Sequence, residues 1–399
     1  MKFLIVQHTN MIGGSLNAAK ELVETLQSIK KNIEVEIYIN NSLKNKTPIE
    51  KKNNNKTVMD KYGVPTFDYF NGCNSIIRVF IKYLFNKRNY KYWKHFFENN
   101  KYNIVILNTS VLWPLRKIIQ HSGAKCFCYV RETVKGNNES IMNKIIRNEL
   151  SKCDKVFFLT KYDMSTWDLK AYKQYVIPET VKLPDATLKT KKALRKELGL
   201  VDEKFYVIYL GGMQRLKGAD IIISTMELIA SSKYCNKIKL LFLGDSGDEP
   251  FSLKKKIIYH DQIRFQKKWN KRIKKNNIES LIQKVGYQSN VYEWIMASDV
   301  VVFPVREVHQ ARPMYEAGVL KHTIIVPEFE NYKEDLINEY NGLTFKPGDP
   351  KDLAKKIVDL YENNNMLRNL AERNYEMACK NHVQEVIQKK LEEIVYCDL

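Results

Sequence analysis

Residues 299–320, DVVVFPVREVHQARPMYEAGVL, join a strand-like run to side chains that could bind an anion and a sugar. Residues 299–305 are rich in β-branched side chains, which favours a strand. Pro313 suits the first turn of a helix, where its missing N–H costs nothing. The free N–H groups of that turn, with Arg312 beside them, could bind a phosphate. Glu316 lies four residues on, on the same helix face, and could accept two hydrogen bonds from a sugar diol.

Two interpretations of this stretch remain open. A cation, a helix terminus and a carboxylate together predict a nucleotide-sugar pocket. Arg312 and Glu316 also have the i,i+4 spacing of an ordinary salt bridge on a surface helix. The elements around the stretch have to distinguish the two interpretations.

Length and composition set the frame for those elements. A chain of 399 residues predicts two domains of roughly 200 residues each. The formal net charge of +20 predicts an anionic partner, which could be nucleic acid, a membrane or a phosphate-bearing substrate. The seven cysteines form no pair of CxxC motifs, so we expect reduced cytosolic thiols and no zinc site. The apolar run in MKFLIVQHTN is short, so we expect no signal peptide, and without an apolar run of about 18 residues we expect no membrane-spanning helix.

Both halves of the chain read as repeated strand, loop and helix units. In the first half, residues 2–7 form a strand-like run, followed by Gly13-Gly14 and a helical pattern. In the second half, residues 205–210 predict a strand, 211–218 a loop and 219–230 a helix. A proline-bracketed segment at 178–184 reads as a linker. The predicted fold class is α/β, with two doubly wound domains that face each other across a cleft.

Two segments are strongly basic. Residues 76–97, IIRVFIKYLFNKRNYKYWKHFF, hold six Lys or Arg among aromatic side chains, and this composition fits the interface of an anionic bilayer. The alternative is a core-facing helix whose lysines are solvated. Single-stranded nucleic acid would also suit the composition, but no recognised nucleic-acid module surrounds it. The second segment, 254–275, contains Trp269 and reads as a surface arm without an assignable role.

Four motifs in combination resemble glycosyltransferase family 4, whose members are retaining enzymes with the GT-B fold of two Rossmann-like domains. Gly13-Gly14 resembles its N-terminal glycine loop, and GGMQRLKGAD at 211–220 resembles its phosphate-binding loop. VGYQSNVYEWIMASDVVVFP at 285–304 resembles the nucleobase-binding strand and the approach to the carboxylate motif. HQARPMYEAG at 309–318 resembles that motif in a variant of polysaccharide-building members. The resemblance covers nearly the whole chain.

The resemblance implies roles for individual residues. Lys217 matches the lysine that holds the diphosphate of the donor, and Glu316 matches the glutamate that binds the ribose. Tyr287 falls where the base is held, although it could equally be an ordinary core residue. The other donor-binding positions are Gly13, Gly14, Gly212, Gln310, Ala311 and Arg312.

The chain departs from the family pattern at three places. Gly212 stands where the family usually has an arginine, and Arg215 could supply the missing charge. Val308 stands where a glutamate usually contacts the donor sugar, and the neighbouring Glu307 or His309 could take that role.

The third departure is Arg131-Glu132, which follows a predicted strand where many members have a histidine. Either side chain could touch the donor sugar or the acceptor. The alternative is an interior ion pair.

The resemblance also implies the domain limits and the reaction. Residues 1–177 would bind the acceptor, residues 178–382 would bind the nucleotide sugar, and a C-terminal helix from about 383 to 399 would return to the first domain. The expected enzyme moves a sugar, with retention and without a metal or cofactor, to a lipid-linked or polysaccharide acceptor of the cell surface. The absence of an Asp-x-Asp triplet fits cationic side chains and helix dipoles in place of a metal.

The expected location is the cytoplasm, peripheral on an anionic inner membrane face, without a nucleic-acid partner. The alternative function is a catalytically inactive GT-B protein that is the membrane-associated partner of another transferase. The missing arginine and the displaced glutamate motivate this alternative.

Overall fold

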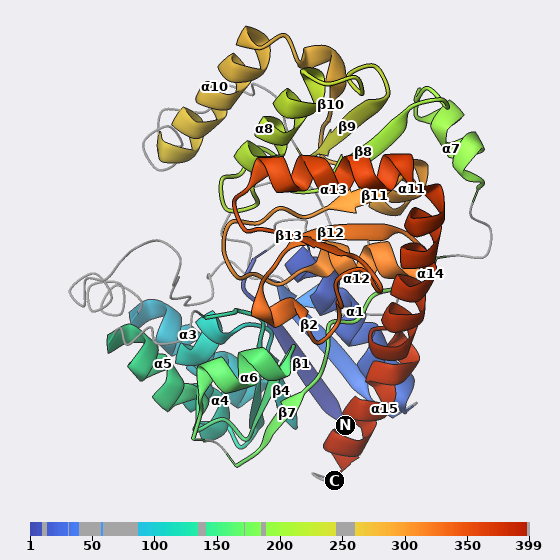
Figure 1. Ribbon diagram of the computed structural model, residues 1–399. Coiled ribbons are helices and arrows are strands. Elements are labelled where there is room, and N and C mark those ends of the chain that lie inside the picture. The colour runs from blue at the N-terminus through green and yellow to red at the C-terminus, as the bar shows by residue number, and fades with distance from the viewer. Residues whose placement is uncertain are drawn as a thin grey trace. The chain divides into compact units, whose positions relative to one another are not determined.

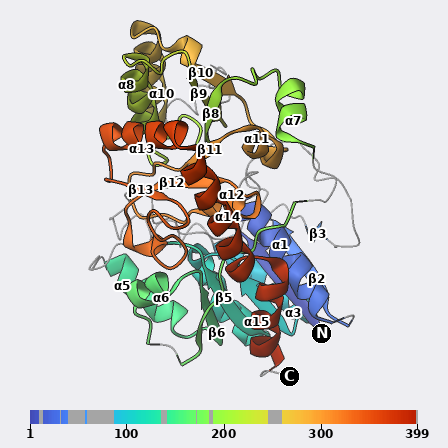
Figure 2. The same cartoon turned by 45° about the vertical axis from the view of Figure 1, so that its right-hand side comes forward.

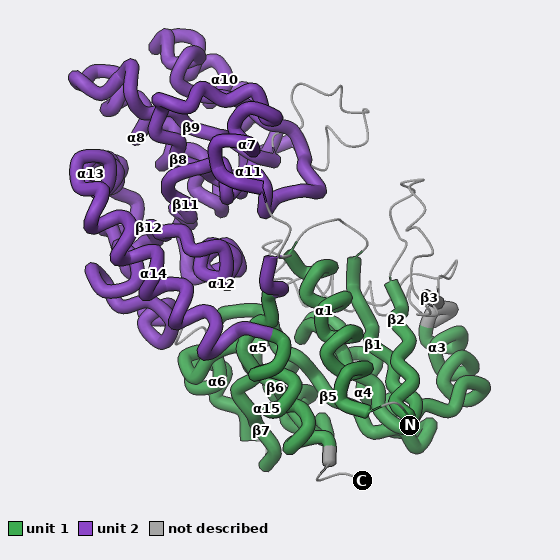
Figure 3. The backbone as a smooth tube through the Cα atoms, turned by 90° about the vertical axis from the view of Figure 1, so that its right-hand side faces the viewer, with its two compact units in different colours: residues 1–181, 384–399 green, residues 182–383 purple. Residues whose placement is uncertain are grey.

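The chain forms two compact units (Figure 3), one of residues 1–181 with 384–399 and one of residues 182–383. The computed structural model describes residues 1–9, 14–30, 32–39, 57–58, 87–134, 141–170, 172–184, 189–244 and 260–396. Gly13 and residues 76–86 lie outside the described residues, as does the start of the second basic segment, 254–259. The division between the units falls four residues beyond the sequence-based limit at 177, within the same proline-bracketed segment.

Unit 1 contains a seven-stranded parallel sheet in the order β3-β2-β1-β4-β5-β6-β7 (Figure 1). Side chains alternate between its faces, so that Leu4 and Val6 enter one core cluster while Phe3 and Ile5 enter the other. Helices cover both faces, which explains the nearly continuous apolar runs of the strands. The strands are β1 (Lys2–Gln7), β2 (Glu34–Ile39), β3 (Thr57–Val58), β4 (Ile104–Leu107), β5 (Lys125–Val130), β6 (Lys155–Phe158) and β7 (Gln174–Val176).

The helices of unit 1 include one that comes from the C-terminal end of the sequence. The described helices are α1 (Gly14–Ile29), α3 (Lys87–Asn99), the 3-10 helix η1 (Ser110–Leu115), α4 (Arg116–His121), α5 (Ile141–Leu150), α6 (Lys161–Trp167) and α15 (Gln384–Tyr396). α15 lies along α1 (Figure 2), and its residues Ile387, Leu391 and Ile394 enter the same core cluster as Leu22 and Leu26 of α1.

The C-terminal part of the chain forms two helices rather than one. The helix α14 (Asn364–Asn381) ends at His382, and α15 begins two residues later. Tertiary contacts fix this break: the His382 ring stacks on Tyr315 with centroids 3.8 Å apart, and its Nε2 lies 3.1 Å from Asp335 Oδ1.

The described part of the first basic segment is a core helix. On α3, Trp93, Phe96 and Phe97 are buried in the unit 1 core, while Lys91 and Lys94 are exposed. These aromatic side chains are therefore not available to a bilayer, as the core-facing alternative predicts. Among the helices of the described residues, none is long and apolar enough to cross a membrane.

Unit 2 contains a six-stranded parallel sheet in the order β10-β9-β8-β11-β12-β13. Its strands are β8 (Phe205–Tyr209), β9 (Ile238–Leu243), β10 (Ile282–Val285), β11 (Val300–Val302), β12 (Thr323–Pro327) and β13 (Leu343–Phe345). The helices that complete the unit are α7 (Lys191–Glu197), α8 (Ala219–Ala230), α10 (His260–Lys275), η2 (Glu279–Leu281), α11 (Val291–Ala297), α12 (Arg312–Val319), η3 (Glu330–Tyr332), α13 (Pro350–Glu362) and α14.

Candidate functional site

The loop between β8 and α8 is held close to the ends of two neighbouring strands by glycines. Gly218 has a φ of +78°, and a Cβ there would lie 1.7 Å from the carbonyl oxygen of Pro304, just beyond β11. Gly212 has a φ of +58°, and a Cβ there would lie 2.5 Å from the carbonyl oxygen of Gly244, just beyond β9. Only glycine combines this backbone conformation with so close an approach. The loop is thereby fixed at the carboxyl edge of the sheet, where open α/β sheets bind ligands.

Lys217 of this loop contacts the segment that follows β11. Its Nζ donates to Nε2 of His309 over 2.5 Å and lies 5.3 Å from the centre of the Phe303 ring. Burial lowers the pKa of Lys217 to about 8. Burial, and then the charge of Lys217, lower the pKa of His309 to about 3. At neutral pH the pair is therefore an ammonium group beside a neutral imidazole, and the poorly solvated ammonium suits an anionic ligand.

His309 is fixed through its backbone. Its carbonyl oxygen accepts hydrogen bonds from the Tyr332 hydroxyl over 2.8 Å and from Asn331 Nδ2 over 3.1 Å. Both donors belong to η3, so this short helix sets the position of the residues just before α12.

The helix α12 starts as the sequence predicts, with Pro313 in its first turn. Arg312 Nε donates to Glu316 Oε1 over 2.8 Å. The expected i,i+4 ion pair therefore forms, but the two side chains are only 11% and 12% exposed. The pair is consequently not the solvated surface bridge of the alternative interpretation. Arg312 follows His309 closely at the start of α12, and Glu316 lies about one helical turn further along that helix.

A second ion pair ties the start of α8 to the segment that follows β11, and sequence reasoning missed it. Arg306 Nε donates to both carboxylate oxygens of Asp220, over 3.1 and 3.0 Å. The backbone N–H of Arg306 also donates to the Leu216 carbonyl over 3.1 Å. An acidic residue in the first turn of α8 was a visible signal. Its partner lies 86 residues away, and no sequence pattern connects them.

The remaining candidate residues of unit 2 differ in exposure. Tyr287 follows β10 and is 53% exposed, so its interpretation as a core residue is wrong and its ring is accessible for stacking. Arg215 and Glu307 are exposed, Gln310 is partly exposed, and Ala311 is buried at the start of α12.

In unit 1, Arg131 forms an interior ion pair, as the alternative interpretation predicts, and its partner is Glu179 rather than Glu132. Arg131 Nη1 lies 2.6 Å from Glu179 Oε2, and its Nε donates to Asn108 Oδ1 over 2.8 Å. Glu132 accepts from the backbone N–H and the hydroxyl of Ser110, over 3.0 and 2.7 Å.

The contacts of Arg131 continue as a hydrogen-bonded chain along the carboxyl edge of the unit 1 sheet. Asn108 Nδ2 donates to Gln7 Oε1 over 2.8 Å, and Gln7 Nε2 donates to the Ser15 hydroxyl over 2.9 Å. Ser15 follows Gly14, the first residue of α1. This network connects the ends of β1, β4 and β5 with the start of α1, and it fixes Arg131 at the predicted ligand-binding edge.

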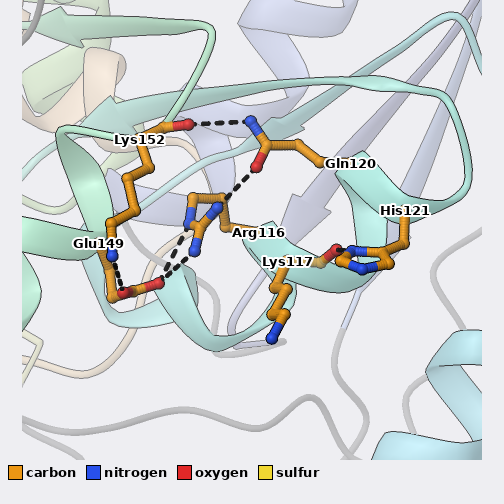
Figure 4. A pocket seen from close by; sticks show the side chains of 6 residues that line it. All are labelled: Arg116, Lys117, Gln120, His121, Glu149 and Lys152. Carbon is orange, nitrogen blue, oxygen red and sulfur yellow. Dashed lines mark hydrogen bonds and ion pairs between the residues drawn. The ribbon is translucent and has the colours of Figure 1, made fainter.

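A pocket of unit 1 lies at the opposite edge of its sheet, where α4 and α5 lead into β5 and β6 (Figure 4). Arg116 Nε donates to Glu149 Oε2 over 3.2 Å, and Arg116 Nη1 donates to Gln120 Oε1 over 2.6 Å. Lys152 Nζ also donates to Glu149, over 2.9 Å. These groups satisfy one another and clamp the two helices together. We therefore do not count this pocket as part of the candidate site.

The comparisons with known proteins point to one family and one fold. Residues 190–377 match the family model described as glycosyl transferases group 1. A search of curated proteins found no significant relative. Among solved structures, Anabaena Alr3699/HepE in complex with UDP and glucose is similar at 14% identity and a TM-score of 0.76, covering 99% of both chains.

Two further solved structures agree. Sucrose-phosphate synthase from Thermosynechococcus elongatus is similar at 15% identity and a TM-score of 0.77, covering 99% of this chain and 98% of that one. The lipopolysaccharide outer core galactosyltransferase WaaB, at 13% identity, has a TM-score of 0.66 and full coverage of both chains. At these identities the likeness shows the fold, and the family model identifies the domain that carries Lys217 and Glu316. The C-terminal unit is therefore a glycosyl transferases group 1 domain, and the protein is a glycosyltransferase with the GT-B fold.

Proposed function

We propose that this glycosyltransferase moves a sugar from a nucleotide sugar to a lipid-linked or polysaccharide acceptor of the cell surface, with retention and without a metal. The observation that carries the proposal is the partly buried ammonium of Lys217, whose Nζ lies 2.5 Å from Nε2 of a neutral His309. The loop that carries Lys217 is held in place by the close backbone approach of Gly212 and Gly218. Such a preorganised cation stabilises a departing diphosphate without a metal ion. A UDP-sugar is the first donor to consider, because the similar HepE structure holds UDP.

The other residues of unit 2 take roles around that cation. The first-turn amides of α12 and Arg312 would bind the diphosphate. Glu316 would accept hydrogen bonds from the ribose, and the exposed Tyr287 ring would stack on the base. Glu307 or His309 would contact the donor sugar.

The proposed reaction needs no protein nucleophile. The bond between the anomeric carbon and the diphosphate breaks, and an acceptor oxygen forms its bond to that carbon on the same face. The departing phosphate takes the proton of the acceptor hydroxyl. Lys217 and the first turn of α12 would stabilise the negative charge that develops on the diphosphate.

A donor panel tests this function. We expect one or more nucleotide sugars to raise the melting temperature, because a ligand stabilises the folded state by mass action, and to support transfer.

Glu316→Ala should raise the KM for the donor by about 10- to 100-fold, as expected for lost hydrogen bonds to a charged group. Glu316→Gln keeps the shape of the side chain and some of its hydrogen bonding. Its KM for the donor should therefore lie between those of the wild type and Glu316→Ala. The function is refuted if the wild type binds no nucleotide sugar. Donor binding without turnover would favour the alternative of an inactive partner, which Gly212 and Val308 motivate.

Metal independence is tested separately. We expect transfer to continue in excess EDTA, because Lys217, Arg312 and the helix terminus provide the positive charge that a metal supplies elsewhere. The measurement is the initial rate of transfer with EDTA, and then with added Mg²⁺ or Mn²⁺. Strict dependence on either ion would contradict this part of the proposal.

We further propose that the enzyme works at an anionic membrane face. Its formal net charge of +20 supports this location.

A further inference from the structure

The helix α10 carries a band of positive charge opposite the face that packs into unit 2. Phe265, Trp269 and Ile273 form its apolar stripe, in which Trp269 and Ile273 are buried in the core cluster and Phe265 packs against it. A seventh basic residue of α10, Arg272, lies beside the apolar stripe with its side chain 43% exposed, and it donates to both carboxylate oxygens of Glu227 on α8, over 2.6 Å each. These contacts fix the orientation of the helix beside α8 (Figure 1).

The outward band comprises six exposed basic residues, which are Arg264, Lys267, Lys268, Lys271, Lys274 and Lys275. At 100° per residue they fall within an arc of about 120°, centred opposite the apolar stripe, and they extend over about 17 Å of helix. The nearest acidic residues along the chain flank the band and do not interrupt it: Asp261 is in the first turn of the helix, and Glu279 follows its end. Like charges at i,i+3 and i,i+4 spacing destabilise a helix, so this arrangement weakens α10 in isolation.

We propose that this band, the α10 band, docks the enzyme on a bilayer of anionic phospholipid. The inference deepens the proposed membrane location and rests on it. The partner follows from charge and shape: flexible lysines on one straight face suit the mobile headgroups of a surface. The aromatic side chains of α10 point into the core, so the band has no stacking platform for single-stranded nucleic acid. For the same reason the contact is electrostatic and involves no insertion into the bilayer.

The test compares two variants that lose the same charge. The first carries Lys267→Gln, Lys268→Gln, Lys271→Gln and Lys274→Gln. The matched control carries Lys192→Gln, Lys196→Gln, Lys351→Gln and Lys355→Gln, which are exposed lysines of α7 and α13. The measurement is flotation with phosphatidylcholine vesicles, with and without phosphatidylglycerol, over a range of salt concentrations.

We expect the wild type to float only with anionic vesicles and to be released by salt. The α10 variant should bind at least about 100-fold more weakly, because each basic residue near an anionic surface contributes about fivefold. The control variant should lose less than about threefold, since its charges act only at long range. Transfer to a soluble acceptor should be unchanged in both variants.

Several outcomes would overturn the inference. Equal losses in the two variants would show a response to net charge alone. Full flotation of the α10 variant would remove α10 as the docking face and leave the membrane location standing. If the wild type did not bind anionic vesicles, both the α10 docking face and the membrane location would be refuted. Sugar transfer by the enzyme in solution would still support the proposed reaction. Binding to dextran sulfate, a soluble polyanion, is measured for the same proteins. If the α10 variant lost this binding and kept its binding to anionic vesicles, the band would be assigned to a soluble polyanion.

Discussion

Lys217→Ala should lower kcat/KM for sugar transfer by about 100- to 1,000-fold, the usual effect of removing a preorganised charge from a developing anion. Lys217, on the loop between β8 and α8, contacts His309 through its Nζ, which also lies over the Phe303 ring. Its burial works against its own charge, as the pKa of about 8 shows. The variant should therefore fold as well as the wild type, and its loss should appear in turnover rather than in melting temperature.

A neutral neighbour controls for disturbance of the loop. Gln214→Ala removes an exposed side chain of the same loop and should change kcat/KM by less than about twofold, as surface substitutions usually do. Steady-state kinetics with the best donor of the panel provide the comparison. Retention of more than half of the activity in Lys217→Ala would exclude this lysine from the reaction and redirect attention to Arg215.

The pH dependence follows from the same ammonium group. In the proposed role, Lys217 binds the diphosphate in its protonated form, so kcat/KM should be constant near neutral pH and fall as the pH rises through about 8. In Lys217→Arg, the fall of kcat/KM at alkaline pH should disappear, because a guanidinium remains charged throughout that range. This holds even if the activity of the variant is lower than that of the wild type at every pH. An unchanged fall in Lys217→Arg would assign it to another group.

The sequence predicts the order of elements well because buried parallel strands leave a strong signal. Residues 205–209 are apolar throughout, and β8 covers those residues. The ends of β10 (Ile282–Val285) are not readable from the sequence, because the strand is too short for alternation to set its ends. The helix break at His382 depends on Tyr315 and Asp335, and neither residue is near it in sequence.

The candidate site divides in the same way. Lys217 and Glu316 are readable because glycines and a proline mark the loop and the helix start that hold them. The contact between Lys217 and His309 joins residues 92 positions apart, and it exists only because β8 and β11 are neighbours in the sheet. Local patterns therefore identify the groups of the site. The strand order decides which of them meet.

Gly218→Ala should disable the enzyme through the backbone. The new Cβ would lie 1.7 Å from the carbonyl oxygen of Pro304, so the loop or the end of β11 has to move by more than 1 Å. That movement separates Lys217 from His309 and strains the hydrogen bond from Arg306 to Leu216. A misplacement of about 1 Å costs about 100-fold in rate, so kcat/KM should fall at least that far. The free energy of unfolding should fall by about 2–4 kcal/mol.

Gly348→Ala isolates the effect of the clash from that of the backbone angle. Gly348 has a φ of +77°, almost the same as Gly218, but nothing lies within 4 Å of a Cβ built there. This variant should lose only about 1–2 kcal/mol of stability from the left-handed conformation and should keep its activity. Urea unfolding and kcat/KM, measured on both variants, separate the two contributions. If Gly218→Ala resembles Gly348→Ala in both measurements, the contact with Pro304 does not position the loop that carries Lys217, because a loop that depends on that contact cannot accept the additional carbon.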